Sequence, residues 1–103
     1  MNIETIQDGN RVRIVLNGVL DEKGAEELKS RIKQLNLGQV TEVTIDCQQV
    51  KHIGSSGIGK ILLLYKHLTT NGGNLTVSGL STPLYELFTE LKMDTLFSVS
   101  KAA

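Results

Sequence analysis

Residues whose types and spacing could do chemistry are concentrated in one stretch, Asp46 to Lys60, which has the sequence DCQQVKHIGSSGIGK. Two adjacent hydroxyls, Ser55 and Ser56, stand there among three glycines, at the point where a loop is expected to enter a helix. A serine at such a point can cap the helix, help to bind a phosphate group or accept one. Three functional alternatives and one purely structural alternative follow.

The first alternative is a phosphate-binding P-loop, because the segment GSSGIGK has the spacing GxxxxGK. That motif needs a serine or threonine after the lysine to hold Mg²⁺, and here Ile61 follows Lys60. The segment 48–53 is also expected to form a loop, whereas a P-loop normally follows its strand closely. The sequence therefore disfavours a nucleotidase.

The second alternative is the glycine-rich turn of short-chain dehydrogenases, which GSSGIG resembles. That turn opens the first βαβ unit of a longer chain, and an acid about 20 residues later binds the ribose. Here the stretch lies in the middle of the chain, and no such acid stands near position 79. A dinucleotide site is disfavoured even more strongly.

The third alternative is a serine displayed at a helix N-terminus for modification. Ser55 or Ser56 would be a good N-cap, and Gly57 and Gly59 would keep the first turn slim enough for another protein to approach its backbone. In the structural alternative, both serines only cap the helix and the glycines only allow close packing of helix on sheet. The residues of this stretch alone leave these two alternatives open.

The elements that position this stretch follow from the hydrophobic pattern. Alternating and β-branched residues predict strands at 2–6, 12–17, 43–47, 75–77 and 96–99, and the turn Asp8-Gly9-Asn10 joins the first two as a hairpin. Gly18 is expected to break the second strand. Apolar residues at helical spacing predict helices over 23–36, 56–70 and 82–91, with Thr82 as the N-cap of the last.

The order of elements is therefore β-β-α-β-α-β-α-β. This order predicts a single α/β domain over residues 1–103, with a mixed, mainly parallel sheet of about five strands and helices packed on it. The opening hairpin supplies the one antiparallel strand. Leu63 and Leu64 widen the apolar stripe of the middle helix, which predicts protein on more than one side of that helix.

Composition and residue spacing disfavour several classes of function. Eleven basic residues balance eleven acidic ones, which disfavours nucleic acid as a partner. Cys47 is the only cysteine, as expected for a core position in a reducing compartment. With no signal peptide or membrane-spanning run recognisable, we expect a cytoplasmic protein that does not insert into a membrane. His52 and His67 lack the spacing of a metal site with Cys47, and no catalytic triad stands out.

Over nearly its whole length the chain resembles the STAS family, which includes the anti-sigma factor antagonists. The segment LNGVLD at 16–21 resembles the family's strand that ends in a GxLD turn. The segment IDCQQVKHIGSSGIG at 45–59 is similar to the family signature, in which a hydrophobic-Asp strand end, a valine and a hydrophobic residue precede D-S-S-G. The match continues with the helix that follows LNGVLD. It also includes Gly72-Gly73, which precede a strand and then an apolar helix.

The resemblance implies a stand-alone anti-sigma factor antagonist, which is a protein-binding switch with no enzymatic activity, cofactor or metal of its own. Ser56 would be the phosphoacceptor, with Ser55 as the second choice. The partner would be an anti-sigma factor that is also a serine kinase, bound while Ser56 is unphosphorylated, and a metal-dependent phosphatase of the PP2C type would reverse the modification. The partner surface would comprise Asp21, Gly54, Ser55, Ser56, Gly57, Ile58 and Lys60.

One departure from the family pattern is Gly54, because an acid usually precedes the two serines. If that acid presents the hydroxyl to the kinase, phosphorylation here would be slow, would move to Ser55 or would not occur. A second STAS role therefore stays open: an accessory subunit of a membrane lipid transporter, in which the same helix docks permanently and Ser56 is never modified. Asp46 is as compatible with closing a strand end as with contacting a kinase.

Overall fold

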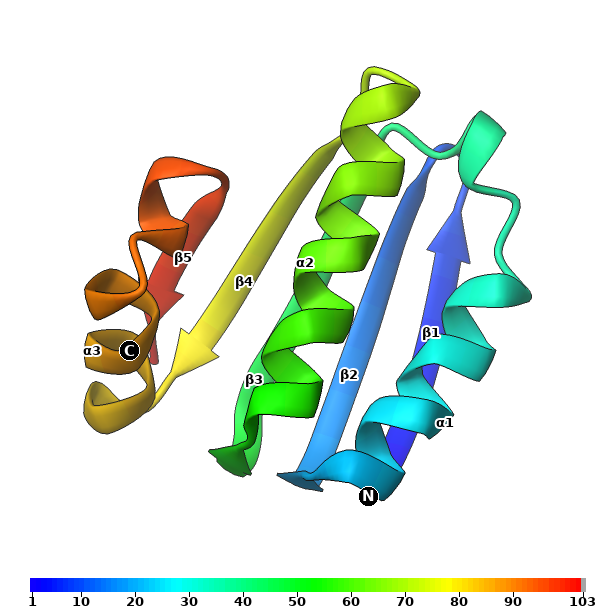
Figure 1. Ribbon diagram of the computed structural model, residues 1–103. Helices are drawn as coiled ribbons and strands as arrows, with labels where there is room; N and C mark the ends of the chain where they lie inside the picture. Colours follow the sequence, from blue (N-terminus) through cyan, green and yellow to red (C-terminus); the bar gives the residue numbers. More distant parts are fainter. Residues whose placement is uncertain (103) are drawn as a thin grey trace.

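A five-stranded sheet and three helices make up residues 1–102, the part of the chain that the computed structural model describes (Figure 1). The elements are β1 (Asn2–Asp8), β2 (Arg11–Leu20), α1 (Glu22–Lys33), β3 (Glu42–Ile53), α2 (Ser55–Thr70), β4 (Asn74–Leu80), α3 (Thr82–Glu90) and β5 (Ser98–Lys101). Two short 3₁₀ helices, Leu37–Gln39 and Met93–Thr95, lie between them. The predicted order of strands and helices is confirmed.

The strands lie in the sheet in their chain order, β1-β2-β3-β4-β5. β1 and β2 are antiparallel, and every other neighbouring pair is parallel, as the opening hairpin and the later helices predict. All three helical crossovers step in the same direction across the sheet. Because such crossovers are right-handed, the three helices are expected on one face, and Figure 1 shows α1 and α2 crossing in front of the strands.

The sheet consequently has one covered face and one open face. Side chains that alternate along the central strands form the floor of the core, and Ile14, Ile45 and Val77 have no exposed surface. Apolar residues of all three helices join them in the core: Leu28, Leu64, Leu68 and Phe88. Many of the alternate residues on the open face are polar, and Arg13 of β2 and Glu42 of β3 are exposed there. The fold therefore has two layers.

The predicted ends of β2 and β3 are wrong, because both strands continue to the edge of the sheet. β2 runs through Gly18, which adopts a φ of 116° instead of ending the strand. β3 runs to Ile53, and its pairing with β2 shifts register twice. Each shift is a bulge that adds one residue to β3, so its buried positions change from every second to every third residue. This loss of alternation made the segment 48–53 resemble a loop.

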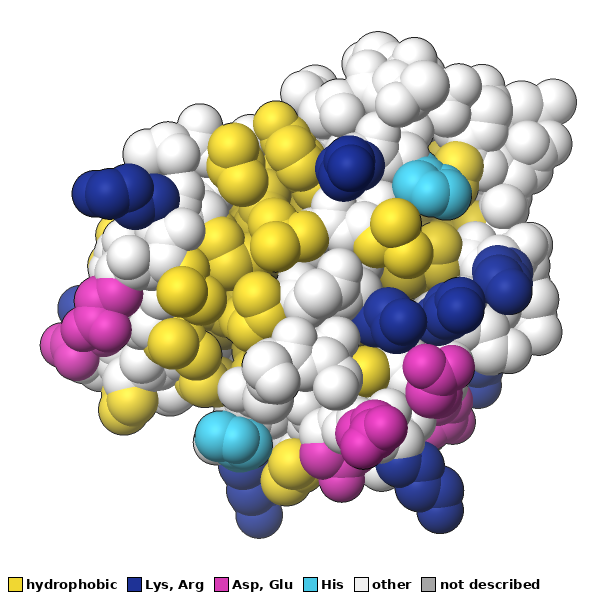
Figure 2. Space-filling view, in the orientation of Figure 1, with side chains coloured by type: hydrophobic (Ala, Val, Ile, Leu, Met, Phe, Trp, Pro, Cys, Tyr) yellow, Lys and Arg dark blue, Asp and Glu magenta, His cyan; other side chains and the backbone are white. Residues whose placement is uncertain are grey.

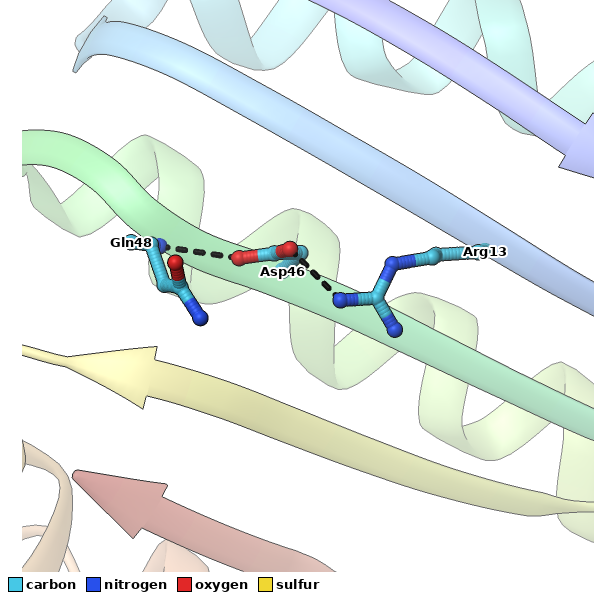
Figure 3. Close-up of polar contacts among 3 residues, drawn as sticks. All are labelled: Arg13, Asp46 and Gln48. Atoms are coloured by element: carbon cyan, nitrogen blue, oxygen red, sulfur yellow. Dashed lines mark hydrogen bonds and ion pairs between the residues drawn. The ribbon is translucent and has the colours of Figure 1, made fainter. Parts of the chain in front are cut away.

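Asp46 supports the first of these bulges from the open face (Figure 3). Its Oδ1 accepts a hydrogen bond from the backbone N–H of Gln48 at 3.0 Å, and its Oδ2 pairs with Arg13 of β2 at 2.6 Å. Gly79 lies in β4, the strand next to β3, and has a φ of 76°. A Cβ at this position would lie 2.5 Å from Cγ of Gln48. Asp46 therefore lies within the strand and stabilises its bulge.

The helix boundaries differ from prediction by a few residues. α1 ends three residues early, at Lys33, and α2 begins at Ser55. Ser81 is the N-cap of α3 in place of Thr82, and β5 spans Ser98–Lys101 instead of 96–99. Within residues 1–102, none of the helices combines the length and the apolar character needed to cross a bilayer.

Candidate functional site

The serine stretch lies at the edge of the sheet where the parallel strands β2, β3 and β4 end. α1, α2 and α3 begin directly after these strands, so this edge collects three helix N-termini. The ends of β2 and β3 are joined, because the N–H of Gly54 donates to the carbonyl of Leu20 at 2.9 Å. Asp21 and Ser55, which follow these two residues, therefore begin neighbouring helices. We refer to Asp21, Gly54, Ser55 and Ser56 as the serine edge.

Asp21 has a structural role at the serine edge. It is the N-cap of α1, and its Oδ1 accepts a hydrogen bond from the N–H of Gly24 at 2.8 Å. The side chain is otherwise exposed, so this contact leaves the carboxylate within reach of a visiting protein. Asp21 is thus a helix cap, while its contact with a partner stays a prediction.

Ser55 and Ser56 are the first two residues of α2, and both are exposed. The prediction that one of them is the N-cap is wrong, because Gly54 occupies that position with a φ of −87° and a ψ of 175°. Gly54 has no side chain to accept from the first turn, and the first backbone hydrogen bond runs from Ile58 to Gly54. The N–H groups of the first turn before Ile58 therefore have no partner within the helix.

Gly57 and Gly59 serve different purposes in α2. Gly57 is buried, and a Cβ at this position would lie 2.6 Å from Cγ of Leu20 and 3.1 Å from its carbonyl oxygen. Gly57 thus allows the first turn to sit directly on the end of β2, as the structural alternative proposed. Gly59 is exposed, and a Cβ at this position would meet no other part of the fold within 4 Å. Because Gly59 has no side chain, no group projects from α2 into solvent at this position.

The structure also bears on the P-loop alternative. β3 does lead straight into Gly54, so the expected intervening loop is wrong. However, the segment from Ser55 to Lys60 is already helical and does not form the loop that would wrap a phosphate chain. Lys60 extends toward α1, where its Nζ lies 3.7 Å from a carboxylate oxygen of Glu26. Asp21 is therefore brought to the serine edge, and Lys60, one turn after Ser56, extends toward α1, so its contact with a partner stays a prediction.

An apolar strip runs along α2 from the serine edge toward α3. Ile58, Leu62 and Tyr65 recur there at helical spacing and are only partly buried, as is Tyr85 on α3. Figure 2 shows yellow side chains gathered over the space that separates α2 from α3 in Figure 1. We refer to Ile58, Leu62, Tyr65 and Tyr85 as the apolar strip. It gives α2 a partly exposed apolar surface that is suited to protein contact.

Sequence reasoning included only Ile58 of this strip among the candidate partner contacts. The signal was present, because the apolar stripe of α2 is wider than one covered face needs. The sheet and α1 do cover two sides of α2, as that width predicts. Yet Leu63 remains 42% exposed and the apolar strip is only partly covered, so part of the stripe belongs to the surface.

Burial prevents Cys47 of β3 from acting as a nucleophile. The thiol is 1% exposed, and burial, followed by the neighbouring Asp46 carboxylate, raises its pKa from 9.0 to about 12. The thiolate is the nucleophilic form of cysteine, so this side chain is inert near neutral pH. It acts as a small apolar residue of the core, as the sequence predicts.

Comparison with known proteins gives matches over most of the chain. A family model described as "Mlab, STAS domain" matches residues 3–98. The anti-sigma factor antagonist SpoIIAA in its unphosphorylated form is 20% identical, with a TM-score of 0.78 over 99% of this chain and 89% of that one.

Two further solved structures share the fold. The phosphorylated form of SpoIIAA from Bacillus is 20% identical, with a TM-score of 0.78 over 95% of this chain and 90% of that one. A sulfate transporter family protein from Wolinella succinogenes is 17% identical, with a TM-score of 0.76 over 88% of this chain and 76% of that one. At these identities the structural likeness is one of fold.

Proposed function

The chain belongs to the STAS domain family, and we propose that it is an anti-sigma factor antagonist, a protein-binding switch without catalytic activity of its own. In this proposal the unphosphorylated chain binds an anti-sigma factor that is also a serine kinase, and so frees a sigma factor. Phosphorylation of Ser56 ends that binding, and a phosphatase of the PP2C type restores it. These partners act in the cytoplasm, which is the compartment we propose for the chain.

The observation that carries this proposal is the position of Ser56. Its side chain is exposed on the first turn of α2 and on the serine edge, two residues before Ile58 of the apolar strip. A kinase can therefore reach the hydroxyl, and a protein that covers the first turn of α2 would meet it. The likeness to SpoIIAA, whose structure is known in unphosphorylated and phosphorylated forms, gives the same proposal independent support.

The phosphate is expected to leave the fold intact. Phosphorylation adds about −1.5 to −2 charges and three acceptor oxygens. At Ser56 these charges would stand beside the unpartnered N–H groups of the first turn, where the helix dipole favours an anion by roughly 0.3–1 kcal/mol. α2 has no acidic residue in its first turn that would oppose the added charge.

The phosphate is expected to act at the partner surface instead. A dianion placed against an apolar or acidic surface must lose its water without gaining a partner, which costs several kcal/mol. Each 1.4 kcal/mol is about a tenfold change in affinity. A loss of roughly a hundredfold therefore needs only part of this cost, and it is enough for a switch.

The proposal is tested by intact mass after incubation with ATP and the serine kinase that the native host encodes for this chain. We expect one added phosphate, mapped by fragmentation to Ser56, and none on the Ser56→Ala variant. The Ser55→Ala variant is the matched control, since it changes the neighbouring exposed hydroxyl and should still be modified. Modification of the Ser56→Ala variant at Ser55, or no modification of any form, would contradict the assignment.

A second candidate is an accessory subunit of a membrane lipid transporter that docks through the same surface without phosphorylation. Two observations favour it: the matching family model is described by the name Mlab, and Gly54 stands where the antagonists usually have an acid. The likeness to a sulfate transporter family protein shows that the fold also occurs in transport proteins. Affinity purification from the native host separates the two candidates, because the first predicts a kinase or phosphatase and the second an ATPase subunit.

A further inference from the structure

A second surface feature lies on the opposite side of α2 from the apolar strip. It is a hollow of about 260 Å³ between α1 and α2, floored by apolar side chains that include Ile32, Leu37, Leu63 and Leu64. Figure 2 shows its position as a smaller group of yellow side chains on the α1 side of α2, bordered by dark blue basic side chains and a cyan histidine. The proposed switch does not use this hollow.

The rim of the hollow is basic. Lys29 and Lys33 of α1 and Lys60 of α2 line it, and no aspartate or glutamate does. Lys60 has a weak partner in Glu26 at 3.7 Å, while among residues 1–102 neither Lys29 nor Lys33 takes part in an ion pair. The formal net charge of the chain is zero, so this cluster of positive charge is a local property of the hollow.

We propose that the hollow between α1 and α2 binds a small amphiphile with one carboxylate, a medium-chain fatty acid in free solution. The tail would lie on the apolar floor, and the carboxylate would face Lys29 and Lys33. On α2 the lining extends from Lys60 to His67, which is about 10 Å of helix rise and suits a tail of medium length. The complementary charge of the rim selects an anionic head over a neutral or cationic one.

The size of the hollow favours a small ligand over a protein segment. Its volume of about 260 Å³ lies just below the usual range of ligand pockets, roughly 300–1,000 Å³. A partner helix would need a longer apolar groove, with anchors repeated over several turns. The apolar strip on the other side of α2 fits such a partner better, so the two faces of α2 serve different occupants.

The test is a titration of the full chain with decanoate below its micelle concentration, followed by amide chemical shifts in a ¹H–¹⁵N NMR spectrum. We expect saturable shifts that are confined to residues 29–37 and 60–67. Decyltrimethylammonium, which has a tail of the same length and a cationic head, should bind at least tenfold more weakly. Binding of both amphiphiles with equal affinity, or shifts centred on the apolar strip, would overturn the proposal.

Charge reversal tests the rim. The double variant Lys29→Glu/Lys33→Glu should bind decanoate about tenfold more weakly or worse, because two attractive charges become repulsive. The matched control is Lys23→Glu/Lys66→Glu, which makes the same change on exposed positions of α1 and α2 outside the hollow and should bind within twofold of wild type. Circular dichroism confirms that both variants are folded. An equal loss in the two variants would overturn the assignment.

A second pair of variants tests the floor. Leu63→Ser, at a side chain that is 42% exposed, should weaken decanoate binding severalfold, and Leu96→Ser, at a side chain that is 46% exposed outside the hollow, should not. Other occupants give different results. Shifts of the hollow residues on dilution of the free chain would indicate a second copy, and binding to phosphatidylglycerol vesicles without binding of decanoate would indicate a membrane surface. Either result would overturn the proposal.

Discussion

Replacing Gly57 with alanine tests how the first turn of α2 is held at the serine edge. The new Cβ would lie 2.6 Å from Cγ and 2.7 Å from Cδ2 of Leu20, and 3.1 Å from its carbonyl oxygen. Leu20 cannot move aside easily, because its side chain is fully buried and its carbonyl accepts the hydrogen bond from Gly54. The first turn of α2, with Ser56 on it, must therefore shift outward.

The expected magnitude is the balance of two opposing effects. Overpacking of a filled core costs about 1–3 kcal/mol. Alanine gains up to about 1 kcal/mol over glycine in a helix, and less near its end. We therefore expect Gly57→Ala to lower the free energy of unfolding by about 1–2 kcal/mol. Gly59→Ala, where within residues 1–102 the added Cβ would meet nothing within 4 Å beyond its own stretch of α2, should raise it by about 0.5–1 kcal/mol.

The assay is urea unfolding of wild type and both variants, followed by far-UV circular dichroism. The two substitutions are chemically identical and lie two residues apart on one helix, so Gly59→Ala controls for helix propensity. We expect the midpoint for Gly57→Ala below that of wild type and the midpoint for Gly59→Ala above it, with similar slopes. Equal midpoints for the two variants would refute the close packing of α2 on Leu20.

Four further predictions concern the serine edge and the buried Cys47. Asp21→Ala should lower the free energy of unfolding by about 1 kcal/mol in urea, because it removes the side-chain cap of α1, whereas Asp21→Asn should keep most of it. Gly54→Asp should raise that free energy by a few tenths of a kcal/mol, since the N-cap dihedrals suit aspartate and a Cβ would lie 3.7 Å from the Leu20 carbonyl. For Cys47, the raised pKa of about 12 predicts about a thousandfold less thiolate than in the unfolded chain, so iodoacetamide at pH 8 should label it only when denaturant is added. The same shift favours the folded state below pH 9, and this contribution should be lost as the pH rises from 9 toward 12, which unfolding measured across that range would show.

The order of strands and helices could be predicted from the sequence because most elements keep a regular period. Val12, Ile14 and Leu16 alternate as a half-buried strand should, and Ala25, Leu28 and Ile32 follow helical spacing. The second half of β3 could not be predicted in this way. Two bulges change its buried period there, and the first packs Gln48 against Gly79 of the neighbouring strand, a pairing that one-dimensional patterns do not reveal.

The candidate site was predicted in part. The resemblance to the STAS family indicated Asp21 and Ser56, and the structure brings their segments together through the hydrogen bond from Gly54 to Leu20. The interpretation of Gly57 as a point of access for a partner could not foresee its contact with Leu20, which is 37 residues away along the chain. The direction of Lys60 toward Glu26 depends on how α1 and α2 pack, and the apolar strip depends on where α3 lies.

The most direct test of the proposed switch is the affinity of the host's anti-sigma factor for Ser56→Asp, compared with wild type and Ser56→Ala. We predict a loss of roughly a hundredfold or more for the aspartate variant, about 2.8 kcal/mol, and near wild-type affinity for the alanine variant. The melting temperatures of all three proteins should be nearly equal. Tight binding by Ser56→Asp, or a loss of affinity that accompanies unfolding, would contradict a switch that acts by charge at an exposed serine.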